Sequence, residues 1–250
     1  MIKNIFQGIK AYGGSLKLIN TLGLWKYFGI PTLISVLTAV SIGFLSWGLS
    51  DNIGGLISKA WIWEWGSETF SAISNYMGAA IILVIGFILY KHIVLALSAP
   101  FMSVVSEKIE SHLMGSQAPL SSSSSMGLLF RGVKINIRNL LLELLLSIPI
   151  LLIRFIPVIG IFSSILLFLL QAYYAGFGNM DYTLERHLIY SESIRFVKKH
   201  KGAAIGNGIL FMLMLLIPVI GIILVLPLSV TAASTETIRI VKGYENKKNN

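Results

Sequence analysis

Long apolar stretches separated by short polar ones run through most of the chain. The first covers Ile30–Leu49, and its 20 residues would form a helix of about 30 Å, the thickness of one hydrocarbon core. The second covers Met77–Tyr90 and resumes at Ile93–Pro100, after Lys91 and His92. The pattern therefore predicts two long transmembrane helices, at 24–50 and 77–99.

Two further apolar stretches are each interrupted by the same pentapeptide. Ile-Pro-Val-Ile-Gly occurs at 156–160 and again at 217–221. Proline blocks a continuing helix and glycine permits a tight reversal. The arm Leu140–Ile153 has 14 residues, about 21 Å of helix, which is shorter than a hydrocarbon core. We therefore expect two re-entrant helical hairpins, at 140–178 and 203–233, with tips at Pro157, Gly160, Pro218 and Gly221. Pairs of kinked full spans are the alternative.

Amphipathic segments account for the remaining residues. Apolar residues recur at helical spacing in 1–22 between lysines, which predicts an interfacial helix or, alternatively, a helix docked on the bundle. Residues 100–139 are expected to form inner-face helices around a Ser-rich loop at 117–125, and 240–250 a polar tail. The predicted fold class is an all-α integral membrane protein with one membrane domain, 1–250.

Charge gives this fold an orientation. The chain has 250 residues, of which 55% are hydrophobic and 12% charged, and its net charge is +9. Basic residues flank the apolar stretches, whereas Ser50–Tyr76 is acidic and rich in tryptophan. Positive loops face the cytoplasm and aromatic residues gather at membrane interfaces, so we expect both termini inside. The same explanation makes a nucleic-acid partner unnecessary.

Signatures of enzymatic chemistry are missing from the sequence. There is no cysteine, the four histidines have no metal-ligand spacing, and no Gly-rich phosphate loop or nucleophile elbow occurs. We therefore expect no enzyme activity, no metal and no cofactor.

Several short stretches resemble the CysZ-type sulfate permeases, which are grouped with the etoposide-induced-protein family. They occur in family order over nearly the whole chain: Gly23–Phe28 leading into Pro31, Ala99–Phe101 followed by Glu107–Glu110, Asp181-Tyr182 followed by Glu185-Arg186, and Ile217–Gly221 with Pro227–Ser234. The resemblance implies two long membrane helices, two half-inserted hairpins and assembly into dimers or larger oligomers. It also implies sulfate uptake across the bacterial inner membrane for sulfur assimilation.

The segment before the first span is the candidate anion site. Amides at a helix N-terminus and a nearby cation suit a doubly charged anion, so Gly23, Leu24, Trp25 and Lys26 could form it. An interfacial Trp-Lys-Tyr anchor is the alternative. The family carries adjacent arginines here, and this chain has Trp25 and Lys26. Lysine acts as a point charge and lacks bidentate recognition, which leaves sulfate and similar oxyanions as candidate substrates.

Three charged residues are candidates for a pore or gate. Arg154 lies close to a predicted hairpin tip, where a cation is costly unless it is paired or hydrated, and Glu143 in the same arm could neutralise it. Glu107 is raised as a gating or ion-pair residue by the family resemblance. For Glu107 and Glu110 together, a solvated face or an interhelical salt bridge is the other interpretation.

Two functions follow from these observations. The first is a permease or channel for sulfate or a similar small oxyanion, in a homo-oligomer surrounded by membrane lipids. The second is a non-transporting membrane scaffold or lipid-interacting protein of the same fold.

Overall fold

The computed structural model describes residues 1–60, 65–115, 123–153, 159–217 and 220–248. Within these ranges the regular structure is entirely helical. The elements are α1 (Ile2–Lys10), η1 (Ala11–Gly14), α2 (Ser15–Thr21), η2 (Leu24–Tyr27), α3 (Gly29–Ser58), α4 (Ser67–Leu97), α5 (Ala99–Met114), α6 (Ser125–Ile153), α7 (Ile159–Leu184), α8 (Tyr190–Lys199), α9 (Lys201–Leu215) and α10 (Ile220–Lys248).

Five of these helices are long and apolar enough to cross a membrane: α3, α4, α6, α7 and α10. The all-helical membrane fold is therefore confirmed, while more long helices occur than the two that were expected. α9 is apolar but has only 15 residues, about 22 Å of helix. It is thus shorter than a hydrocarbon core of about 30 Å.

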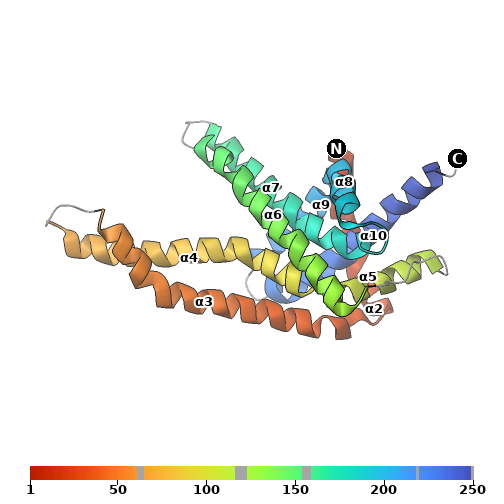
Figure 1. Ribbon diagram of the computed structural model, residues 1–250, viewed down its shortest axis with the longest axis horizontal. Coiled ribbons are helices and arrows are strands. Elements are labelled where there is room, and N and C mark those ends of the chain that lie inside the picture. The colour runs from red at the N-terminus through yellow and green to blue at the C-terminus, as the bar shows by residue number, and fades with distance from the viewer. Residues whose placement is uncertain (61–64, 116–122, 154–158, 218–219, 249–250) are drawn as a thin grey trace.

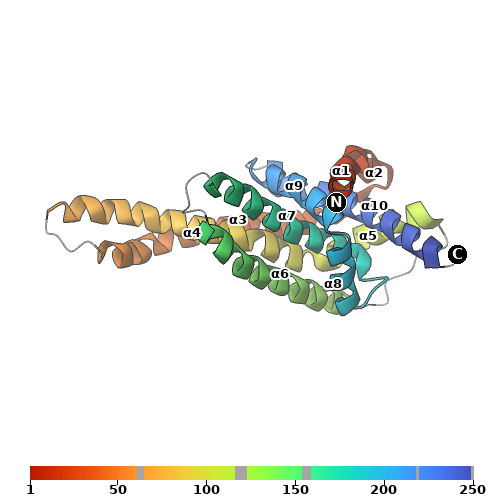
Figure 2. The same ribbon diagram turned by 90° about the horizontal axis from the view of Figure 1, so that it is seen from above.

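The helices α3 and α4 form the longest hairpin, which extends away from the rest of the molecule (Figures 1 and 2). Glycines bring the two backbones together, since a methyl carbon at Gly78 would lie 2.6 Å from the carbonyl oxygen of Ser50. With 30 and 31 residues, both helices run well past the expected spans. The segment expected as an outer loop, Ser50–Tyr76, is largely helical because nothing in its described part interrupts either helix until Lys59 and Gly66.

A single helix, α6, covers both the expected inner-face segment 126–139 and the expected hairpin arm 140–153. The sequence changes there from basic and amphipathic to apolar, but it has neither glycine nor proline between Val133 and Ile148 to end a helix. The arm that appeared too short is thus the second half of a 29-residue helix. α6 and α7 form a second hairpin, which points away from the end where both termini lie (Figures 1 and 2).

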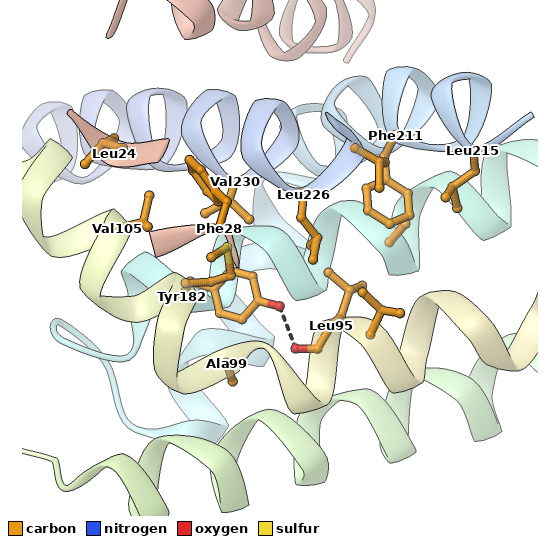
Figure 3. Packing of buried hydrophobic residues seen from close by; sticks show 14 of the residues in the cluster. Leu24, Phe28, Leu95, Ala99, Val105, Tyr182, Phe211, Leu215, Leu226 and Val230 are labelled. Atoms are coloured by element: carbon orange, nitrogen blue, oxygen red, sulfur yellow. Dashed lines mark hydrogen bonds between the residues drawn. The ribbon is translucent and has the colours of Figure 1, made fainter. Parts of the chain in front are cut away.

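The helix α10 lies at the centre of the bundle. Over the most apolar 18 residues of α10, 72% of the residues are buried, whereas the figure for the matching stretch of α3 is 17%. Around it, Leu24 and Phe28 from the N-terminal segment meet Leu95 of α4 and Phe211 of α9 in one core (Figure 3). Tyr182 of α7 donates a hydrogen bond of 2.6 Å to the carbonyl oxygen of Leu95.

The N-terminal segment docks on this bundle rather than lying entirely free on its surface. A methyl carbon at Gly8 would be 2.7 Å from the carbonyl oxygen of Ala203, and one at Gly206 would be 2.2 Å from that of Ile5. On the other side of α1, Ile2 and Phe6 are exposed. The expected helix at 1–22 is thus divided into α1, η1 and α2, with one face buried and one available to the interface.

Candidate functional site

Three ionisable side chains meet in the interior between α4 and α6. The Lys91 Nζ lies 2.6 Å from Oε1 of Glu143, and the His92 Nε2 lies 3.1 Å from Oε2. The three side chains are at most 3% exposed. We call Lys91, His92 and Glu143 the central ion cluster.

The central ion cluster is also connected to α7. Lys91 Nζ contacts the backbone carbonyl oxygen of Gln171 at 3.5 Å. The Nδ1 atom of His92 is buried and has no hydrogen-bond partner within the described chain. Burying such groups costs free energy that their pairing only partly offsets, so ionisable residues between apolar helices usually mark a functional path.

A second ion cluster joins α5 to the end of α7. Arg186 donates hydrogen bonds to Glu110 Oε2 at 2.8 Å and to Ser106 Oγ at 2.7 Å, and His187 contacts the other oxygen of Glu110. Burial raises the pKa of the Glu110 carboxyl, but the hydrogen bonds and charges of His187 and Arg186 outweigh burial and hold that pKa below its ordinary value. Glu110 is thus held as an anion by two neighbours.

A third pairing ties α6 to α7 and α8. Arg131 donates to both carboxylate oxygens of Asp181, at 3.0 and 2.9 Å, and to Ser193 Oγ at 2.7 Å. It also donates to the backbone carbonyl oxygen of Leu188 at 2.9 Å. This bidentate arrangement fixes geometry and, with the other two bonds, uses four of the five guanidinium N–H groups of Arg131.

The predicted anion segment lies at the surface beside the core. Gly23 has the left-handed φ of 59°, and its amide donates to the carbonyl oxygen of Asn20, which removes it as an anion donor. Leu24 is fully buried, whereas Trp25 is exposed and donates from Nε1 to Asn20 Oδ1. Lys26 carries the positive charge of this segment, and its side chain is exposed.

A second lysine reaches the same place from α5. The Lys26 Nζ lies 5.4 Å and the Lys108 Nζ 5.3 Å from the centre of the Tyr27 ring. Neither has an acidic partner within salt-bridge distance in the described residues. Two exposed cations thus converge on one aromatic ring directly before α3.

Two of the residues expected to line a pore, Glu143 and Glu107, lie in the described part of the chain. Glu143 uses both carboxylate oxygens on Lys91 and His92, and Arg154 lies outside the described residues. Glu107 is half-buried and has no polar partner among the described side chains, while Glu110 makes the salt bridge with Arg186. The sequence showed Lys91 and His92 as a break in an apolar stretch, but nothing in the pattern paired them with Glu143.

The hairpin tips are described in part. Pro157 and Pro218 lie outside the described residues. Gly160 lies in the first turn of α7, and Gly221 lies in the first turn of α10. A methyl carbon at Gly221 would lie 2.1 Å from the carbonyl oxygen of Met214, so this glycine permits the close approach of α9 and α10. In the described residues no three His, Asp or Glu side chains are grouped as metal ligands would be.

The fold and the buried ion clusters together define the class of protein. It is a multi-pass α-helical membrane protein with ionisable groups buried between apolar helices. Residues 11–225 match the family model described as Sulfate transporter CysZ/Etoposide-induced protein 2.4, and the chain belongs to this family. This membership confirms the resemblance seen in the sequence and supports a membrane transporter role; the family is one of transporters, not of enzymes.

Curated relatives agree over nearly the full length. Two proteins from Pseudomonas aeruginosa strains and one from Pseudomonas paraeruginosa, each named Sulfate transporter CysZ, are 25% identical to this chain over 237 residues. The alignment covers 93% of this chain and 95% of each relative. The similarity thus extends over nearly the whole chain.

Proposed function

We propose that this protein is a permease or channel for sulfate or a similar small oxyanion in the bacterial inner membrane, where it supplies sulfur assimilation. The observation that carries the proposal is the central ion cluster, three buried ionisable side chains among apolar helices of a transporter-family protein. Such groups usually line the route of a polar solute.

The anion would first meet Lys26 and Lys108. Both ammonium groups are exposed and lie within 5.4 Å of the Tyr27 ring centre, so their positive potentials add at one place. Each lysine can donate hydrogen bonds in several directions to an oxyanion but cannot make the planar bidentate contact of arginine. This site would therefore select an anion by its charge more than by its shape, so several small oxyanions could bind there.

Deeper groups would set the electrostatics of the path. In the central ion cluster Glu143 balances the charge of Lys91, so that neither an uncompensated cation nor an uncompensated anion is buried. A permeating dianion could neither pass a bare carboxylate nor leave a bare ammonium readily. A balanced cluster therefore suits passage, and Arg154 and Glu107 remain proposed pore residues.

The proposed topology has both termini in the cytoplasm and re-entrant hairpins at 140–178 and 203–233, in a homo-oligomer. The short α9 supports re-entry of the second hairpin, because 15 residues do not cross the hydrocarbon core. Polar groups at membrane depth need protein or water around them, which neighbouring subunits would supply.

The deciding experiment is radiolabelled sulfate uptake into proteoliposomes of the purified protein. We expect flux above that of empty vesicles, reduced by excess unlabelled sulfate, and competition by sulfite, molybdate and phosphate would define the substrate class. Flux equal to that of empty vesicles would overturn the proposal. Remodelling of the vesicles without flux would instead support the scaffold function.

A further inference from the structure

The outer face of α6 carries a groove that neither the ion clusters nor the proposed path uses. It is shallow and open rather than an enclosed cavity, and it is lined by residues of α6 alone, among them Phe130, Val133, Lys134, Ile137, Arg138 and Leu141. Apart from the two cationic side chains, this lining is apolar. We call it the α6 groove.

Aromatic rings of neighbouring helices hold both cations of the α6 groove. The Lys134 Nζ lies 4.3 Å from the ring centre of Tyr190, and the Arg138 Cζ lies 5.5 Å from that of Phe177. Neither cation has a carboxylate within salt-bridge distance in the described part of the chain. Arg131 on the same helix is paired with Asp181, so the two groove cations are set apart by their unneutralised charge.

An exposed apolar stripe continues from the α6 groove toward the tip of the hairpin. Leu141, Leu145, Ile148 and Leu152 follow at helical spacing, and each is between 56% and 65% exposed. From Lys134 to Leu152 the helix rises by about 27 Å. The face thus has two cations at one end and an acyl-length apolar track beyond them.

We propose that the α6 groove is a binding site for an anionic phospholipid, with the lipid phosphate between Lys134 and Arg138 and an acyl chain along the stripe. Cations at the headgroup level attract anionic lipids, and the apolar track matches a hydrocarbon chain. A second copy of this chain fits less well, because the chain carries 20 basic and 11 acidic residues and would bring mainly like charge to this end.

The test compares lipid retention by native mass spectrometry of the purified protein, titrated with phosphatidylglycerol or phosphatidylcholine. We expect phosphatidylglycerol to bind at least tenfold more tightly than phosphatidylcholine. The double variant Lys134→Gln/Arg138→Gln should weaken phosphatidylglycerol binding by roughly 10- to 30-fold, as expected for two lost cations. Its phosphatidylcholine binding should not change.

Matched variants separate a site from general charge and from misfolding. Lys198→Gln/Lys201→Gln removes two exposed lysines of α8 and α9 and should stay within about twofold of the wild type. Lys134→Arg/Arg138→Lys keeps both charges and should retain binding, whereas Leu141→Trp fills the groove and should weaken it.

Any of several results would overturn the proposal. One is unchanged phosphatidylglycerol binding in the Gln double variant, and another is an equal loss in the Lys198/Lys201 control. Displacement of the lipid by millimolar inorganic phosphate would identify a site for free anions and would overturn it too. A change of oligomeric mass in the Gln variant with unchanged lipid binding would assign the groove to a second copy and would also overturn it.

Discussion

Lys91 of α4 and Glu143 of α6 form a salt bridge of 2.6 Å although they are 52 residues apart in sequence, and neither side chain is more than 2% exposed. The pair joins the α3–α4 hairpin to the α6–α7 hairpin. Two buried charges usually stabilise a fold no better than apolar side chains of the same volume. The pair is therefore weak evidence for added stability, and its burial is consistent with the proposed role in transport.

Glu143→Gln should destabilise the protein on the order of 3 kcal/mol, because it leaves the Lys91 ammonium buried without its counter-charge. Thermal unfolding of the purified protein in detergent measures this loss. Sulfate flux should fall as well, since an uncompensated cation would hold a dianion in the path.

The double variant Lys91→Met/Glu143→Leu separates the two effects. It removes both charges and leaves the buried His92 ring without its carboxylate partner, so it should lose less stability than Glu143→Gln, which leaves a buried charge unpaired. Its flux should be lost if the cluster serves transport. A folded double variant with wild-type flux would show that the central ion cluster is structural.

Because Glu110 is held ionised in the folded protein, we expect the protein to lose stability in acid. The folded-state pKa of Glu110 lies below the ordinary value of 4.5 because His187 and Arg186 favour the carboxylate. A depressed folded pKa contributes stability that is complete above the unfolded value and is lost as the pH falls toward the folded one. The melting temperature should therefore fall as the pH drops below about 4.5, and Glu110→Gln should start lower and lose this part of the slope. Parallel pH profiles for the two proteins would contradict the assignment.

The helices α7 and α9 approach so closely at Gly208 that a methyl group there should not be tolerated. A carbon added at Gly208 would lie 1.7 Å from the carbonyl oxygen of Ala172, a backbone atom that cannot move alone. Gly208→Ala should destabilise the protein by about 1–3 kcal/mol. Gly48→Ala in α3 is the control, because its methyl group meets no neighbouring helix in the described chain. Equal melting temperatures for both variants would show that the helices separate without cost.

The sequence predicted the helical membrane fold because apolar stretches of span length have few alternatives in lipid. It did not predict how the helices end. At residue 139 the change from amphipathic to apolar looked like a boundary, yet helix formation depends on backbone geometry, and nothing between Val133 and Ile148 disturbs it.

The site was harder to predict because ion pairing is a property of tertiary structure. Glu143 was expected near Arg154 in the same arm, but Lys91 and His92 occupy its carboxylate from a helix 52 and 51 residues away. Glu110 makes a salt bridge, as one interpretation expected, but its partner Arg186 lies in the turn that follows α7. Lys26 was identified from its place before a helix, whereas its neighbour Lys108 becomes apparent only when α5 is packed against η2.

Lys26 and Lys108 should share the binding of the first anion. Each single change to Ala should weaken sulfate binding roughly tenfold or less, as expected for one partly screened cation. The double change should weaken it further without altering the melting temperature, because both side chains are exposed. Radiolabelled sulfate binding measures the effect, and Lys10→Ala is a matched exposed lysine. Binding unchanged in Lys26→Ala would end the assignment of this segment to the anion.

Re-entry of the hairpins is testable because the chain has no cysteine, so every introduced cysteine reports alone. Membrane-impermeant thiol reagents should label cysteines at Glu68, at the far end of α3–α4, from outside, and at Lys198 in α8 from inside. If each hairpin turns within the membrane, cysteines at Val158 and Val219 should not react from outside. They should react from inside, through a watery passage, at a rate that excess sulfate lowers. Reaction of both cysteines only from outside would overturn re-entry, and the transport proposal would then depend on the ion clusters and the family alone.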